Sequence, residues 1–132
     1  MKLNPRELEV LKILHATEQP LTSTQIVRAG EELTQSTVQA VLRKLMANGM
    51  IEVQGVTHSG NVLSRTFGAT EKSREILTQR FLDSYKNYRN IISIKMAIEG
   101  MLDMEEDEAM REEDIKAIEK VVAELKAGLK KK

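Results

Sequence analysis

The stretch "TQSTVQAVLRKLMANGMI", residues 34–51, combines an amphipathic helix, a helix stop and the start of a strand. Four apolar residues recur at i, i+3, i+4 and i+7, the spacing of one buried helix face: Val38, Val41, Leu42 and Leu45. Thr34 is a favourable N-cap, and Asn48-Gly49 favours a left-handed C-terminal stop. We therefore predict a helix between these signals, with its polar side outward.

The residues before this helix predict two shorter helices. Asn4 as the cap, Pro5 at the first helical position and Glu7 at the third indicate the first start. Its expected buried stripe is Leu8, Leu11, Ile13 and Leu14. "QPLTSTQIV", residues 19–27, ends this helix and starts a short one capped by Thr22 or Ser23. That second helix should bury Ile26 and Val27.

The residues after the helix stop predict a β-hairpin. Residues 51–57 begin with alternating apolar and polar residues, "HSGN" has a turn composition, and residues 62–67 form the return strand. Three helices followed by a hairpin is the order of a winged helix. Strict alternation places Arg65 on the side of Leu63 and Phe67, which we expect in the core. Either a bulge turns Arg65 outward, or its stem packs and its guanidinium reaches solvent.

The second half of the chain predicts further helices. Thr70 caps a long helix whose apolar residues are Ile76, Leu77, Phe81, Tyr85 and Tyr88. Another helix, about 90–102, is apolar around most of its circumference and must be buried by something. The acidic stretch "DMEEDEAMREED" is expected as a linker. A last helix follows it, with apolar residues spaced 3, 4, 3 and 4 positions apart as in a coiled coil, and the chain ends in a frayed "KKK" tail. We predict a DNA-binding region over 1–70 and a helical dimerisation region over 71–129.

Composition narrows the class of protein. The 132 residues are 41% hydrophobic and contain no cysteine, which fits a small cytoplasmic protein without disulfides or thiolate metal sites. Neither a signal peptide nor a run of the ~20 apolar residues that a membrane helix needs is expected. Net charge is zero, but residues 34–74 carry five basic and two acidic side chains. An electrostatic footprint for DNA would lie there.

The polar side of the helix over 35–47 is the candidate DNA-reading surface. An α-helix fits the major groove, where amide, guanidinium and hydroxyl groups read base edges. Ser36, Gln39, Ala40 and Arg43 lie on this side, with Gln35, Thr37 and Lys44 at its margins. The same residue types are also ordinary solvent-facing helix residues. In the hairpin, His58, Asn61 and Arg65 are further candidates for contacts to the DNA backbone, although a Ser-Gly-Asn turn is often only a turn.

The chain resembles a known family over nearly its whole length. "LTSTQIVRAG", "LTQSTVQAVLRKLMANGMIEVQG" and "FLDSYKNYRNIISI" followed by "EEDIKAIEKVVAEL" are similar to the penicillinase-repressor (BlaI/MecI-type) family of bacterial winged-helix repressors. The resemblance implies a mostly α fold: a winged helix-turn-helix of three helices plus a β-hairpin wing, then C-terminal dimerisation helices. It implies a homodimer on operator DNA. The matching positions that would face the groove and backbone are Ser36, Thr37, Gln39, Ala40, Arg43 and Lys44.

The apolar residues of the C-terminal helices are the candidate dimer interface. They are Ile91, Ile94, Ile98, Met101, Ile115, Ile118, Val122 and Leu125. Alternatively, they close onto helices of their own chain. Some family members are inactivated by a sensor protease near the start of this region, and Asn87-Tyr88 is loosely similar to that cut site. A copper-responsive branch uses C-terminal cysteines, which this chain lacks.

Other functions have weaker support in the sequence. His15 and His58 lie on different predicted elements without neighbouring ligands, so we expect no metal site and no cofactor. No phosphate loop or nucleophile motif indicates an enzyme. The main alternative is a winged-helix module that binds a protein rather than specific DNA. A third is a winged-helix regulator with a small-molecule effector, which requires a ligand pocket that sequence does not reveal.

Overall fold

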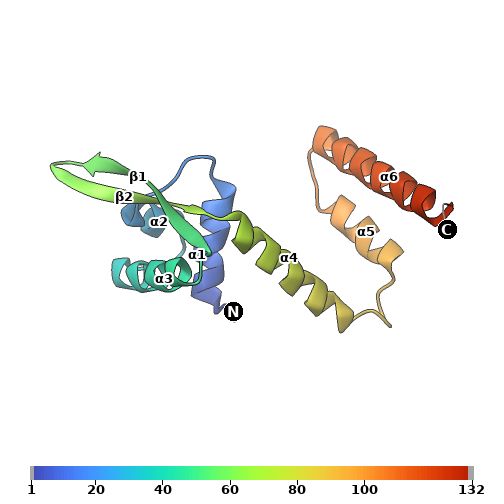
Figure 1. Cartoon of the computed structure of the whole chain (residues 1–132), viewed down its shortest axis with the longest axis horizontal. Coiled ribbons are helices and arrows are strands. Elements are labelled where there is room, and N and C mark those ends of the chain that lie inside the picture. The colour runs from blue at the N-terminus through green and yellow to red at the C-terminus, as the bar shows by residue number, and fades with distance from the viewer. Residues whose placement is uncertain (1, 131–132) are drawn as a thin grey trace. The chain divides into compact units, whose positions relative to one another are not determined.

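The computed structural model describes residues 2–130, which contain six helices and two strands (Figure 1). The chain divides into two compact units, residues 1–82 and 83–132. No helix among the described residues is long and apolar enough to span a membrane. The elements are α1, Pro5–Ala16; α2, Ser23–Ala29; α3, Gln35–Ala47; β1, Ile51–Ser59; β2, Val62–Ala69; α4, Glu71–Lys86; α5, Ile94–Asp103; and α6, Glu108–Lys130.

Capping boxes start α1 and α2 where the sequence predicts them. The Glu7 N–H donates to Asn4 Oδ1 at 2.9 Å, and the Asn4 N–H donates back to Glu7 Oε1 at 2.8 Å. In α2 the cap is Thr22, which exchanges the same two hydrogen bonds with Gln25. The structure thus decides between the two predicted caps. Ser23 is the first helical residue.

Local signals also fix both ends of α3. Thr34 Oγ accepts a hydrogen bond from the Thr37 N–H at 3.2 Å. Gly49 has φ 71°, and the Met50 N–H donates to the Leu45 carbonyl at 2.9 Å. Glycine adopts this left-handed conformation without the steric cost that a Cβ would add. The stop predicted at Asn48-Gly49 is confirmed, and it turns the chain directly into β1.

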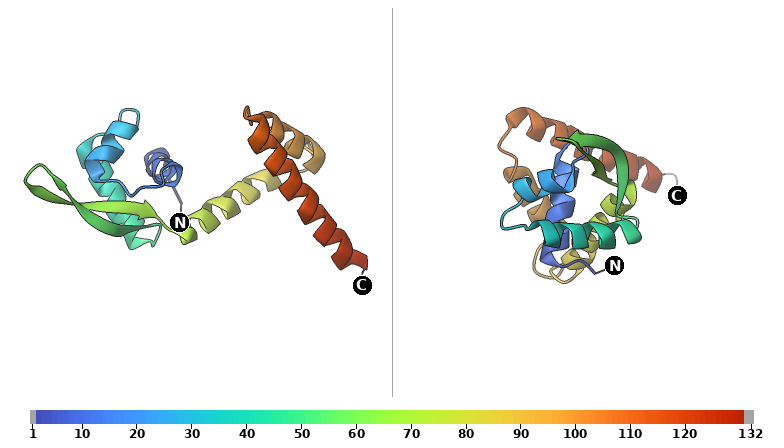
Figure 2. Two further views of the ribbon diagram at one scale, coloured as in Figure 1. Left: turned by 90° about the horizontal axis from the view of Figure 1, so that it is seen from above. Right: turned by 90° about the vertical axis from the view of Figure 1, so that its left-hand side faces the viewer.

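The strands form one antiparallel hairpin, which is longer than the prediction (Figure 2). A bulge lies between Val53 and Gly55, and a third short segment joins the sheet through the Leu21–Phe67 bridge. The distal half of the hairpin projects past α2 and α3, as Figure 1 and the left view of Figure 2 show. Leu63, expected in the core, is therefore 64% exposed, and that expectation was wrong.

The core of the first unit joins α1, α2, α3 and the base of the hairpin. The predicted inner face of α3 is confirmed as buried, and Ile26 is fully buried with it. In α1 the stripe is shifted: Leu8 and Ile13 are only half-buried, and Val10 takes part instead. The buried apolar residues are Leu3, Val10, Leu11, Leu14, Ile26, Leu33, Val38, Val41, Leu42, Leu45, Met50, Ile51 and Phe67.

The first half of α4 belongs to the same compact unit. Thr70 caps it as predicted, accepting a hydrogen bond from the Ser73 N–H at 3.2 Å. Ile76 and Leu77 pack against the core, and the Arg80 guanidinium donates to the Leu3 carbonyl at 3.3 Å. The first unit consequently continues to residue 82, beyond the hairpin end where we placed the predicted boundary.

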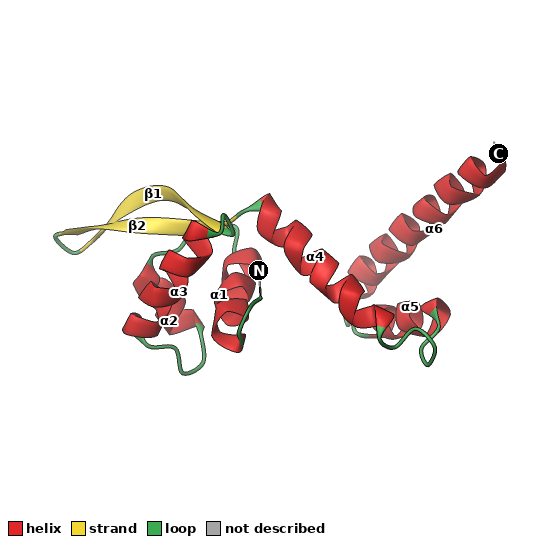
Figure 3. Ribbon diagram, turned by 60° about the horizontal axis from the view of Figure 1, so that its bottom comes forward, coloured by secondary structure: helices red, strands yellow, loops and turns green. Residues whose placement is uncertain are grey.

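The second unit contains two helices whose starts differ from the predictions (Figure 3). Residues 87–92 are turns, and Ser93 caps α5, so this helix begins later than the expected residue 90. Asp107 Oδ1 accepts a hydrogen bond from the Ala109 N–H at 2.9 Å, and α6 begins at Glu108, inside the stretch predicted as a linker. An acidic side chain at a helix N-terminus is favourable, which explains the earlier start. Of the predicted tail, residues 131–132 lie outside the described residues.

Candidate nucleic-acid interface

The outward side of α3 carries the polar residues that the sequence assigns to DNA. Ser36, Gln39, Ala40 and Arg43 are exposed, opposite the buried face of the same helix. Thr37 is half-buried, and its hydroxyl accepts a hydrogen bond from the Thr34 hydroxyl at 2.9 Å, within the N-cap. The helix therefore presents hydroxyl, amide and guanidinium groups along one accessible side, the donor set that reads base edges in a major groove.

Gln35 links the N-termini of two helices. Its Nε2 donates to Ser23 Oγ at 2.8 Å, which ties the start of α3 to the start of α2. The bond fixes the position of this amide and uses one of its donors. Gln35 is therefore held in place beside the predicted reading face, with its remaining polar atoms exposed to solvent.

A cleft of about 290 Å³ lies between α3 and the wing, the hairpin β1–β2. Three of the predicted DNA-binding residues line it together: Gln39 and Arg43 from α3, and Arg65 from β2. The cleft brings together cationic groups that are 22 positions apart in the sequence. The other predicted residues are outside its lining: Gln35, Ser36, Thr37, Ala40, Lys44, His58 and Asn61.

Arg65 remains on the same face of the wing as Phe67, and its charge stays exposed. The bulge between Val53 and Gly55 lies on the other strand and does not turn it over. Its guanidinium carbon lies 5.4 Å from the centroid of the Phe67 ring, a cation–π distance. No bulge turns Arg65 outward: the guanidinium itself lies over the Phe67 ring at the wall of the cleft, and the side chain stays exposed.

Lys44 forms an ion pair within the fold. Its Nζ lies 2.7 Å from Glu7 Oε2, and the Glu7 side chain is almost completely buried. Burial raises the pKa of the Glu7 carboxyl, but the hydrogen bonds from Lys44 and the Asn4 backbone, with the lysine charge, outweigh it and leave this pKa lowered. The predicted phosphate contact at Lys44 therefore carries a charge that Glu7 already compensates.

The sequence interpretation missed the pairing role of Glu7, for which there was a signal. Glu7 precedes Val10, Leu11 and Leu14 at i, i+3, i+4 and i+7, so it lies on the buried face of α1. A carboxylate on such a face needs a cationic partner or several hydrogen bonds. Glu7 has both, one oxygen bonded to the N-cap and the other to Lys44.

The tip of the wing is more apolar than the sequence interpretation allowed. His58 and Asn61 are exposed there, and Gly60 has φ 66° at the turn. Val56, Val62 and Leu63 are also exposed because this part of the hairpin extends past the core. The wing tip thus combines polar groups suited to a DNA backbone with uncovered apolar side chains.

The second unit leaves its predicted interface residues largely uncovered within one chain. No residue of α5 is buried, although the helix is rich in isoleucine and methionine. Ile98 and Ile118 are half-buried and line one shallow hollow between α5 and α6. The remaining predicted interface residues are exposed: Ile91, Ile94, Met101, Ile115, Val122 and Leu125.

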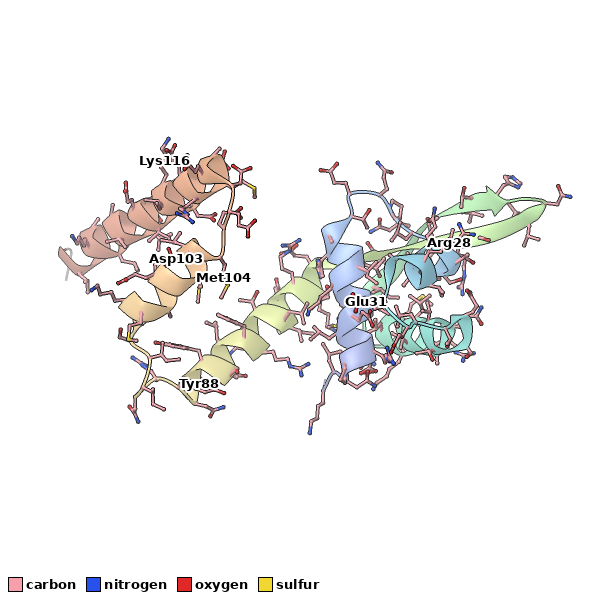
Figure 4. The ribbon with its side chains drawn as sticks, turned by 180° about the vertical axis from the view of Figure 1, so that it is seen from behind. Arg28, Glu31, Tyr88, Asp103, Met104 and Lys116 are labelled. Carbon is pink, nitrogen blue, oxygen red and sulfur yellow. The ribbon has the colours of Figure 1, made fainter. Side chains whose placement is uncertain are left out.

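The segment resembling a protease cut site follows the end of α4. Asn87 and Tyr88 lie in the turns that lead to α5, and both are exposed (Figure 4). The Tyr85 hydroxyl donates to the Ile92 carbonyl at 2.8 Å, and the Ile91 N–H donates to the Tyr88 carbonyl at the same distance. The segment is accessible, but these hydrogen bonds hold its backbone.

Comparisons with known proteins agree with a winged-helix regulator. The model of the penicillinase repressor family matches residues 3–124, so the chain belongs to this family of transcriptional regulators. The resemblance deduced from the sequence is confirmed. No curated protein sequence matches the chain significantly.

Solved structures share the fold at low sequence identity. Bacillus subtilis PadR in complex with operator DNA has a TM-score of 0.51 and 17% identity over 61% of this chain. A MepR mutant from a multidrug-resistant S. aureus isolate has a TM-score of 0.52 and 20% identity, covering 94% of this chain and 80% of that one. H. salinarum RosR has a TM-score of 0.53 and 14% identity, and the match covers 77% of this chain and 92% of the RosR chain. This chain spans 48% of the PadR chain, and these likenesses establish the winged-helix fold.

Proposed function

We propose that the protein is a sequence-specific, double-stranded DNA-binding transcriptional repressor that acts in the cytoplasm. One observation carries the proposal: the exposed polar side of α3 adjoins a cleft where Arg43 of the helix and Arg65 of the wing meet. Phosphate binding requires cations, and base reading requires fixed donors and acceptors on an accessible helix. Family membership and the DNA complex of a PadR with the same fold support this assignment.

We further propose that it binds DNA as a homodimer through its C-terminal helices. Ile94 is 57% exposed and Leu125 63% exposed, and apolar surface of this extent is costly to leave in water. A second copy supplies an equally apolar surface, because a two-fold interface brings the same patch of each chain together. Two recognition helices would then address half-sites about 34–36 Å apart on a pseudo-palindromic operator.

The test combines two substitutions on the reading face with a matched control. Gln39→Ala and Arg43→Ala should each weaken binding to a selected duplex by about tenfold or more, since one good base contact contributes about 1–3 kcal/mol. Lys116→Ala also removes one exposed cation, but from a side of α6 that points away from α5, and should leave affinity unchanged (Figure 4). Fluorescence anisotropy with selected and scrambled duplexes measures these affinities.

Equal affinity for selected and scrambled duplexes, unaltered by both reading-face substitutions, would remove the case for specific recognition. The winged helix would then have to serve a protein partner instead. Circular dichroism of each variant separates lost recognition from lost folding. Gln39 and Arg43 are exposed and belong neither to the buried core nor to the half-buried apolar residues packed against it, so both variants should fold.

Cleavage by a sensor protease near Asn87-Tyr88 remains a proposal based on the family resemblance. Exposed turns are preferred sites of proteolysis, and this turn lies between α4 and α5. Limited digestion of the full chain with a protease of broad specificity should cut first within residues 87–93. A first cut at the wing tip, residues 59–62, would count against this site.

A further inference from the structure

The cleft between α3 and the wing has an apolar floor beneath its cationic rim. Leu42 and Phe67 belong to the core, with 3% and 5% of their surfaces exposed, and the half-buried Met46 lies beside them. Contacts to a DNA phosphate use only the rim, because a phosphate is hydrated and has no apolar part. A DNA phosphate alone therefore leaves the apolar floor of the cleft unused.

The rim of the cleft, formed by Arg43, Arg65 and the polar side chains beside them, has the charge and the hydrogen-bond donors of a site for an organic anion. Among the described residues, no carboxylate pairs with Arg43 or Arg65, and none of the eight residues that line the cleft is acidic. The Phe67 ring holds the Arg65 guanidinium from below. Ser23 Oγ already accepts from Gln35, which leaves its O–H to donate to a ligand.

We propose that this cleft binds a small organic anion with an apolar ring, and that the bound anion antagonises DNA binding. The carboxylate would lie between the guanidinium groups of Arg43 and Arg65, and the ring would lie against Met46 and the small accessible parts of Leu42 and Phe67. The volume of about 290 Å³ is at the lower end of the range of small-molecule sites. The antagonism rests on the proposed DNA-binding function, because DNA and ligand would compete for the same two guanidinium groups.

Binding is tested on the full-length protein without DNA. The probe is 2-naphthoate, whose own fluorescence reports binding, with 2-naphthalenemethanol as its neutral counterpart and acetate as an anion without a ring. We expect 2-naphthoate to bind at least about tenfold more tightly than either, since a charge-assisted hydrogen bond and ring burial each contribute about a factor of ten. Equal binding of the neutral compound, or of acetate, would overturn the proposal.

Substitutions locate the site. Arg43→Gln and Arg65→Gln should each weaken 2-naphthoate binding about fivefold to tenfold, a range reduced for solvent-exposed charges. Lys116→Gln also removes one positive charge, but from the second unit, and should leave the affinity for 2-naphthoate unchanged. Ser64→Phe places a ring in the cleft while keeping both arginines, and should abolish binding. Unchanged binding in both arginine variants would overturn the assignment, even if the Ser64 variant failed to fold.

The effect of the bound anion on DNA binding is measured in a separate experiment. Saturating 2-naphthoate should lower the affinity for a selected duplex at least about tenfold, and 2-naphthalenemethanol should not. Binding of 2-naphthoate with unchanged duplex affinity would refute the antagonism. If the protein bound no duplex specifically, the proposed DNA function would fail, while the binding experiment without DNA would still decide whether the cleft holds the anion.

Discussion

Replacing Lys44 by methionine should destabilise the first unit, because it leaves the buried Glu7 carboxylate without its cation. Lys44 Nζ lies 2.7 Å from Glu7 Oε2, and only 1% of the Glu7 surface is exposed. A buried charged acceptor that loses such a bond costs about 1.5–3 kcal/mol. Half of the Lys44 side chain is exposed, so water can partly replace it, and we expect the lower part of this range, about 1.5–2 kcal/mol.

Urea denaturation of the full chain, followed by circular dichroism at neutral pH and one protein concentration, measures this loss. The control is Lys12→Met, the same chemical change at an exposed position of α1, which should change the free energy of unfolding by less than about 0.5 kcal/mol. Adding Glu7→Gln to Lys44→Met should recover part of the loss. Glutamine keeps the capping box with Asn4 and removes the uncompensated charge.

The pH dependence has a defined sign. The pKa of Glu7 is lowered in the folded protein from its usual 4.5, so its stabilisation is complete above pH 4.5 and is lost as pH falls through the lowered value. The difference between wild type and Lys44→Met should therefore narrow below pH 4.5. If Lys44→Met costs no more than Lys12→Met at neutral pH, the ion pair does not stabilise the fold and our reasoning about Glu7 is refuted.

Three further predictions concern a histidine, the charge of the cleft and the second unit. His15 Nε2 lies 2.8 Å from Ser73 Oγ, and burial, then the charge of Arg74, lowers its pKa below 6.5. Stability should thus fall as pH decreases from 6.5, and His15→Gln should remove this slope in urea denaturation between pH 7 and 5.5; an equal slope in both proteins would contradict it. Arg65 of the two subunits supplies two phosphate contacts, which should contribute about −2 to the slope of log K for DNA against log salt. Arg65→Ala should reduce that slope by about 2, and an unchanged slope would exclude Arg65 from the backbone contacts. Sedimentation should give twice 14.9 kDa for the wild type and a shift toward 14.9 kDa for Leu125→Glu, with Lys116→Glu unaffected; a wild-type monomer at micromolar concentration would refute the interface.

Features set by neighbouring residues were predictable from the sequence. Caps such as Thr34 and the stop at Gly49 depend on hydrogen bonds within a few residues, and the structure contains them. The ion pair between Glu7 and Lys44 was not predicted, because it joins two helices through tertiary packing. Whether a hairpin ends at the core or extends beyond it also depends on the helices beneath it, which is why Leu63 was misplaced.

In the candidate site, too, some features could be predicted from neighbouring residues and others depend on tertiary packing. The helical period of the sequence is sufficient to place Gln39 and Arg43 on the outer side of α3. Alternation along β2 left two orientations for Arg65, and only the position of its guanidinium over the Phe67 ring distinguishes them. The cleft that joins these residues, with its apolar floor, depends on the relative position of α3 and the wing, for which the sequence carries no periodic signal.

Selection from a random duplex library with the full-length protein tests the central claim most directly. We predict enrichment of a pseudo-palindromic consensus whose half-sites are centred about 10 base pairs, or one helical turn, apart. Such a consensus would demonstrate both sequence-specific reading by α3 and the two-fold arrangement of subunits. Recovery of duplexes without any shared sequence would contradict the claim that this winged helix reads DNA.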